Sequence, residues 1–181
     1  MAHLCARRRE ARGAYRSSGR ARERTAERRG RQLSHLSRSE VEPYRTRAFK
    51  VGEMLYESIG VARADKPGRY RQYARNYQFF GAPVGLFVAT ETSFGVAQWA
   101  DIGGYLQTVM LLARDYGLHT CPQQAWVAFH KTVRAHLDLP DGWMVYSGLA
   151  MGYEDPDAPI NRWRTPREPL ESFAVFDGFP G

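Results

Sequence analysis

Two short stretches of the sequence hold residues that could bind a flat, anionic cofactor. The first is TCPQQA, residues 120–125, in which a proline stiffens the chain and removes one backbone donor, so that neighbouring N–H groups can point at the edge of a ring. The second is NRWRTPR, where Arg162, Arg164 and Arg167 alternate with rigid residues. A guanidinium group is planar and permanently charged, and it suits a phosphate. A solvated surface segment would carry the same arginines, and the residues alone leave both interpretations open.

Chemistry carried by the chain's own side chains is not visible in the sequence. The motifs of serine hydrolases, zinc proteases, paired-cysteine sites and phosphate-binding loops are absent from the sequence. His119 and Cys121 lie close together, but no third or fourth ligand accompanies them, so we expect no metal site. We therefore name no catalytic side chain and expect any reaction to depend on a bound cofactor.

A long apolar helix must position the first stretch. It is expected from Gly95 to Tyr116, followed by a helix-ending glycine at Gly117. Its apolar side chains cover so much of the circumference that we expect the helix to be central. Gly103 and Gly104 lie in its interior, where each glycine costs about 1 kcal/mol relative to alanine. A neighbouring helix, a partner chain or a flat ligand is expected to approach the backbone there.

The other expected elements indicate an α+β fold, with helices packed around a small antiparallel sheet. Helices are predicted over residues 44–61, 70–80 and 126–137, buried strands over 83–89 and 143–152, a loop over 120–125 and an extended segment over 153–173. The aromatic residues at positions 70, 73, 77 and 80 recur at helical spacing and predict a core-facing stripe.

The charge is concentrated at the N-terminus. The 181 residues carry a net charge of +7, yet residues 1–40 hold twelve arginines against four glutamates, and the rest is nearly neutral. We expect residues 1–40 to form a disordered, arginine-rich tail and residues 41–181 to form the domain. A nucleic-acid-binding or membrane-surface arm is the alternative for the tail, but aromatic side chains do not alternate with its arginines, and we do not expect nucleic acid as a partner.

The cysteines and the hydropathy favour a cytoplasmic protein. Cys5 and Cys121 are the only cysteines and do not make a disulfide framework. The sequence has neither a continuous apolar stretch of membrane-spanning length nor the apolar region of a secretory signal.

Four motifs in order give the chain a resemblance to a known family. They are FFGAPVGLFV, QWADIGGYLQTVMLLARDYGLHTCPQQAW, SGLAMGYEDPDAPINRWRTPREPLESF and FDGF, and the resemblance that they carry runs from about residue 42 to residue 179. The chain resembles the FMN-dependent nitroreductases, which are homodimers that use NADH or NADPH to reduce nitroaromatics, quinones or related acceptors.

The resemblance implies roles for particular residues. Pro122, Gln124 and Ala125 would lie along the reactive edge of the flavin, and Arg164 and Arg167 would bind its phosphate. Phe94 and Trp99 would line the pocket of a small aromatic acceptor, with core packing as the alternative. Gly103 and Gly104 would allow the central helix to approach its dimer mate.

The sequence also departs from the family. The N-terminal segments that supply much of the phosphate site and contact the ribityl chain have no counterpart before residue 42. Two interpretations remain: an FMN-dependent oxidoreductase with an incomplete N-terminal part, or a truncated, non-catalytic remnant that dimerises without holding flavin.

Overall fold

The computed structural model describes residues 3–8 and 41–178 and confirms the expected α+β class. The chain divides into two compact units, and each is described by itself. Unit 1 contains residues 66–154 together with the N-terminal strand, and unit 2 contains residues 155–178 together with residues 41–65.

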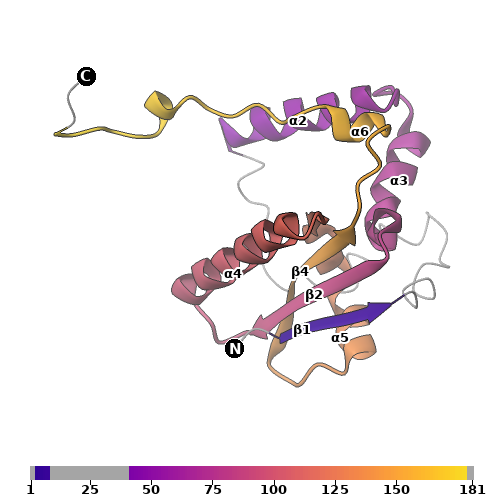
Figure 1. Cartoon of the computed structure of the whole chain (residues 1–181), viewed down its shortest axis with the longest axis vertical. Helices are drawn as coiled ribbons and strands as arrows, with labels where there is room; N and C mark the ends of the chain where they lie inside the picture. Colours follow the sequence, from indigo (N-terminus) through magenta and orange to yellow (C-terminus); the bar gives the residue numbers. More distant parts are fainter. Residues whose placement is uncertain (1–2, 9–40, 179–181) are drawn as a thin grey trace. The chain divides into compact units, whose positions relative to one another are not determined.

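A four-stranded antiparallel sheet forms the centre of unit 1. Its strands are β1 (His3–Arg8), β2 (Val84–Glu91), β4 (Trp143–Gly152) and β3 (His119–Gln123), in that order across the sheet. Figure 1 shows β1, β2 and β4 running side by side. Strands β2 and β4 are the inner pair and are rich in β-branched and aromatic residues, which favour a pleated, buried surface.

The strand β1 corrects the expected tail. The sequence predicts no element before residue 41, whereas His3–Arg8 pair with β2 from His3 opposite Ala89 to Arg8 opposite Val84. Backbone groups along an unpaired sheet edge can bind an added strand whatever its side chains are, which is why hydrophobicity did not reveal it. Residues 9–40, the remainder of the predicted tail, lie outside the described residues.

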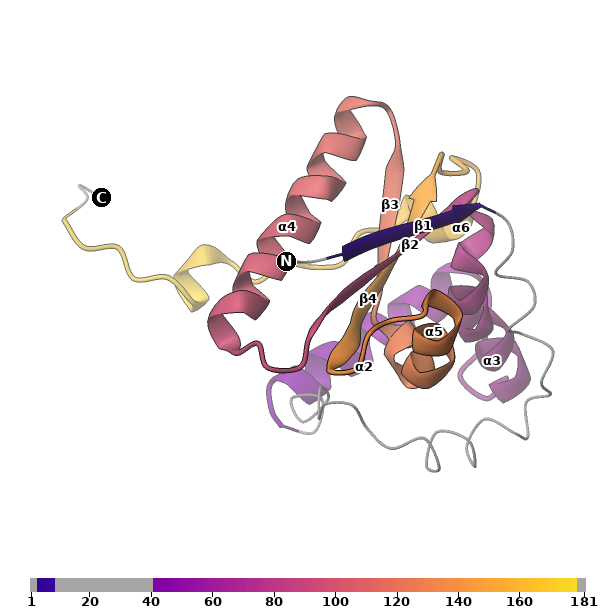
Figure 2. The same ribbon diagram turned by 90° about the horizontal axis from the view of Figure 1, so that it is seen from below.

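The helix α4 (Val96–Asp115) covers one face of the sheet, as Figure 2 shows. Ile102 and Leu106 of α4 pack against three buried strand residues, Leu86, Val88 and Leu149. This confirms the predicted helix. The helix is not buried around its whole circumference, however, because Leu111 and Leu112 are 61% and 56% exposed. A Cβ atom built on Gly103 or Gly104 would meet no atom within 4 Å.

An aromatic cluster covers the opposite face. Phe87 points there because successive side chains of a strand alternate between faces. The helices on this side are α3 (Lys66–Ala74), the 3₁₀ helices η3 (Arg75–Gly81) and η4 (Gln124–Phe129), and α5 (His130–Leu137). Their buried residues that join Phe87 in the cluster are Tyr77, Phe79, Trp126 and Val133.

The predicted aromatic stripe over residues 70–80 is only partly correct. Tyr77 is buried, but Tyr70 and Tyr73 are exposed, and Phe79 takes the core position instead. The helix α3 ends at Ala74, and Phe79 and Phe80 have positive φ angles of 49° and 53°. This turn rotates the chain away from the periodicity of an α-helix and directs Phe79 onto the sheet.

Unit 2 consists of the helix α2 (Tyr44–Ser58), the short helix α6 (Pro159–Arg162), the 3₁₀ helix η5 (Leu170–Ser172) and extended chain. An ion pair of 2.9 Å between Arg47 Nε and Glu168 Oε1 links α2 to the extended segment. In the described part of the chain, no helix is long and apolar enough to cross a membrane.

Two glycines of the sheet are required by the aromatic cluster. A Cβ atom on Gly148 would overlap the Trp126 ring, and one on Gly85 would overlap the Phe79 ring. Because a close-packed core tolerates little added volume, the two rings depend on bare backbone beneath them.

We expect Gly148→Ala to lower the free energy of unfolding by about 1–3 kcal/mol through overpacking. Gly52→Ala is the control, because a Cβ atom at this position in α2 meets nothing within 4 Å. Urea unfolding of both variants measures the difference. A Gly148→Ala protein as stable as the wild type would show that the Trp126 ring has room to move.

Candidate functional site

The segment expected to be a loop over residues 120–125 is a strand followed by a helical turn. Strand β3 pairs with β4, with Cys121 opposite Ala150 and Pro122 opposite Leu149. β3 is an edge strand of the described sheet. A proline is tolerated in an edge strand because its missing N–H can lie on the unpaired side. The loop predicted over residues 120–125 is therefore wrong for residues 120–123, because Pro122 is compatible with an edge strand.

Gln123, the last residue of β3, lies inside the protein, although Cys121, which strand alternation would place on the same side, is exposed. Gln123 is 2% exposed, whereas Pro122 and Gln124 are exposed. Its Nε2 atom donates a hydrogen bond to the Asn76 carbonyl oxygen at 2.8 Å. Within the described residues its Oε1 atom has no hydrogen-bond partner.

Trp126 fixes the other end of this segment. Its ring is buried and packs against Tyr77, Phe79 and Phe87, with ring centroids 4.9–5.3 Å apart. Aromatic pairs at such distances add specific contact energy to the area they bury. The main chain of Gln124 and Ala125 thus lies between the strand β3 and the buried indole ring of Trp126.

The backbone donors at this point suit a ligand with carbonyl or ring-nitrogen acceptors. Gln124 begins η4 and Ala125 follows it. A helix leaves its first N–H groups without an acceptor inside the helix, so these two donors are available to a bound group. Pro122, Gln124 and Ala125 therefore lie at the junction between the end of β3 and the start of η4.

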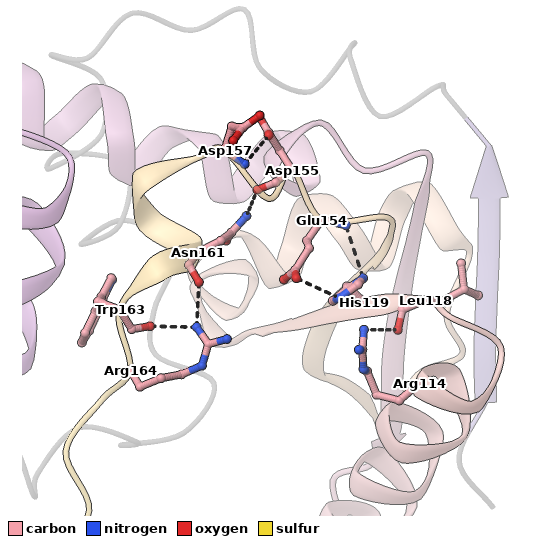
Figure 3. A network of polar contacts seen from close by, with 9 residues as sticks. All are labelled: Arg114, Leu118, His119, Glu154, Asp155, Asp157, Asn161, Trp163 and Arg164. Carbon is pink, nitrogen blue, oxygen red and sulfur yellow. Dashed lines mark hydrogen bonds and ion pairs between the residues drawn. The ribbon is translucent and has the colours of Figure 1, made fainter.

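A polar network holds the start of β3 in place, as Figure 3 shows. His119 Nε2 lies 3.1 Å from Glu154 Oε1, and the Glu154 backbone N–H donates to His119 Nδ1 at 3.3 Å. A neutral imidazole with its proton on Nε2 satisfies both contacts. Arg114 Nη1 donates to the Leu118 carbonyl oxygen at 3.3 Å and so joins the end of α4 to the strand.

His119 is thus engaged with a carboxylate rather than grouped with further metal ligands. Among residues 3–8 and 41–178, no three histidine, cysteine or acidic residues are placed to hold a metal ion.

The arginine segment lies in unit 2, and its three arginines differ in their partners. Arg162 Nη2 is paired with Asp157 Oδ1 at 3.2 Å. Arg164 donates to the carbonyl oxygens of Asn161 and Trp163 at 2.7 and 3.0 Å, as Figure 3 shows.

Arg167 likewise donates to main-chain carbonyl oxygens, those of Thr165 and Pro166. Within the described part of the chain, the charges of Arg164 and Arg167 have no carboxylate partner. Both side chains are exposed, so their remaining N–H donors can reach an anion.

The two aromatic residues predicted for an acceptor pocket lie near the start of α4 in unit 1. Phe94 and Trp99 are both half-buried. The Trp99 Nε1 atom is buried and has no hydrogen-bond partner among the described residues. The predicted site residues therefore fall into two units: Arg164 and Arg167 in unit 2, and the other five in unit 1.

The chain was compared with known proteins. The model of the nitroreductase family matches residues 6–153. The match begins well before residue 42, where the motif resemblance was placed, and overlaps the strand β1.

Among curated proteins, the chain is similar to a 4-nitrobenzoate reductase from Pseudomonas putida, with 39% identity over 147 residues that cover 81% of this chain and 65% of that protein. It is also similar to a 4-nitrobenzoate reductase from Nocardioides sp. (strain LMS-CY), with 40% identity over 136 residues that cover 75% and 55% of the two chains. The chain thus spans 55–65% of the length of these two relatives.

Among solved structures, it is similar to the FMN and NADPH-dependent nitroreductase NfnB from Sphigopyxis sp. strain HMH. The TM-score is 0.84 with 38% identity, and the alignment covers 98% of this chain and 80% of that one. The NfnB from Mycobacterium smegmatis, solved with NADPH, has the same fold, with a TM-score of 0.82 and 24% identity.

Cys121, beside the candidate site, gives a prediction about thiol chemistry. The residue reaches solvent, yet desolvation raises the pKa of its thiol above the ordinary value. Because only the thiolate reacts, we expect Cys121 to be alkylated by iodoacetamide more slowly at pH 7–8 than a cysteine in an unfolded peptide. Peptide mass spectrometry across a pH series measures this. If the alkylation rate of Cys121 reached half of its maximum at the same pH as that of the peptide, or at a lower pH, the expectation would be wrong.

Proposed function

The chain belongs to the nitroreductase family, and from this membership we propose that it is an FMN-dependent oxidoreductase that uses NADH or NADPH to reduce a nitroaromatic, a quinone or a similar acceptor. The family match over residues 6–153 is the observation that carries the proposal. The names of its relatives support the choice of a nitroaromatic acceptor.

FMN, when bound, would carry reducing equivalents from the nicotinamide to the acceptor. The chain's own part is to bind and orient it. The backbone N–H groups of Gln124 and Ala125 are donors for the oxygen and nitrogen atoms on the edge of the ring system, and Pro122 stiffens the strand in front of them. The chemistry of these donors therefore fits the group.

Arg164 and Arg167 are proposed to bind the phosphate. A dianionic phosphate is matched by two guanidinium groups that no carboxylate of residues 41–178 neutralises, and each charge-assisted hydrogen bond contributes about 1.5–3 kcal/mol. Arg162, which already pairs with Asp157, is a poorer candidate. Phe94 and Trp99 are proposed to stack on the acceptor, with core packing as the alternative role.

A homodimer is proposed to form through α4. Leu111 is exposed, and Gly104, seven positions before it and so on the same side of the helix, has open space over its backbone, as does the adjacent Gly103, so a second backbone can approach this helix. Burial of such a surface in a partner chain is favourable by about 25 cal/mol per Å².

The proposal is tested by purifying the full chain with excess FMN, removing free flavin and recording the visible spectrum and the molecular mass. We expect a yellow dimer that is bleached by NADH or NADPH without oxygen and recolours with 4-nitrobenzoate. A folded, colourless dimer would overturn the proposal in favour of a non-catalytic, flavin-free protein.

Substitution of the arginines separates their roles. We expect Arg164→Ala and Arg167→Ala each to weaken FMN binding about tenfold or more, since each removes a charged donor to the phosphate. Arg162→Ala is the matched control from the same segment and should stay within about twofold of the wild type. Equal effects at all three positions, measured by flavin fluorescence titration, would indicate general electrostatic attraction instead.

Gly103→Ala tests the dimer. In a chain with no partner helix at this position, the added methyl group should stabilise α4 by about 0.5–1 kcal/mol. Across a close helix contact it should instead weaken dimerisation about tenfold or more through overpacking. Light scattering over a concentration series measures the dissociation, with Gly52→Ala as control. Unchanged dimerisation of Gly103→Ala would exclude a close backbone contact at this glycine.

A further inference from the structure

Two side-chain links, made by three hydrogen bonds, connect the segment around Gln124 to the 3₁₀ helix η3. The first comes from Gln123, whose buried amide Nε2 donates to Asn76 at both the carbonyl oxygen, 2.8 Å away, and the side-chain Oδ1, 3.3 Å away. The two residues are 47 positions apart in the sequence, so this contact is a tertiary one.

The second comes from Tyr77, the residue after Asn76. Its hydroxyl group donates to the Ala125 carbonyl oxygen at 3.3 Å. The Tyr77 ring is 6% exposed and packs edge-on against Trp126 and Phe129, with centroid distances of 5.3 and 4.6 Å. Because the ring is packed on two sides, the hydroxyl group is aimed at Ala125 rather than free to turn to solvent.

The two contacts flank Gln124. Consecutive residues of η3 bind Gln123 on one side and Ala125 on the other. The sheet already holds β3 up to Gln123, and the aromatic cluster already holds Trp126. What these hydrogen bonds add is anchorage of the residues on both sides of Gln124, which restricts how far the peptide groups between them can move.

We propose that Tyr77 and Gln123 are positioning residues that fix the backbone donors of Gln124 and Ala125 for the flavin edge. The inference rests on the proposed function and extends it to residues that touch no ligand. The position of these donors matters at a redox site, because a misplacement of the reacting groups by about 1 Å can reduce a rate about 100-fold.

Tyr77→Phe is the appropriate variant, because it removes the hydroxyl group and keeps the packed ring. Thr92→Val is its control. The Thr92 hydroxyl group also donates to a distant main-chain oxygen, that of Gly142 at 2.9 Å, within the same unit. Gln123→Met removes the other link at similar side-chain length.

Amide hydrogen exchange and flavin binding are measured on the full chain. In the protein without flavin, we expect Tyr77→Phe to speed exchange at residues 124–126 about tenfold while strands β2 and β4 stay unchanged. In fluorescence titrations its affinity for FMN should fall about three- to tenfold, and that of Thr92→Val should stay within twofold. Gln123→Met should repeat both effects if it folds.

The results separate the two proposals. If the wild type binds FMN and Tyr77→Phe matches Thr92→Val in local exchange and affinity, the positioning role is wrong and the proposed function stands. If exchange rises over the whole of unit 1 instead of at residues 124–126, the role is merely structural. If the wild type binds no FMN, the proposed function fails, and the flavin part of this inference fails with it.

Discussion

The contact between the Trp126 ring and the bare backbone of Gly148 is the constraint on which much of unit 1 depends. It places an indole directly on the inner strand β4, and this is possible only where the strand carries no Cβ atom. The same ring then meets Tyr77, Phe79 and Phe87, which belong to η3 and β2. Gly148 thereby fixes where η3 and β2 meet β4. The donors of Gln124 and Ala125 owe their position to it, because the chain enters the cluster immediately after them.

Periodicity predicted the elements that bury a continuous apolar surface. The strands β2 and β4 and the helix α4 were located within one or two residues of their observed bounds, since each has a full set of core contacts. The strands β1 and β3 were missed, because an edge strand is held by backbone hydrogen bonds that leave little trace in side-chain hydrophobicity. The turn at Phe79 was missed for a related reason. Its positive φ angles accompany the packing of the Phe79 ring on Gly85, a contact that the local sequence does not reveal.

The candidate site was predictable as far as its residue types were distinctive. A proline before two polar residues and an arginine-rich segment were visible in the sequence, and the structure distinguishes Arg162, paired with Asp157, from Arg164 and Arg167. Gln123 and Tyr77 were not selected, because their roles depend on contacts across 47 and 48 positions of sequence.

The proline of β3 has a consequence outside the binding site. An edge strand presents unpaired backbone groups to any other extended chain, and such edges are where sheets of separate molecules join. At Pro122 the edge offers no N–H group, so an incoming strand would lose a hydrogen bond at the fourth residue of a five-residue edge. The residue that stiffens the chain beside the candidate flavin site also protects this side of the sheet from intermolecular strand addition, and its replacement would expose the protein to aggregation even if the fold of the single chain survived.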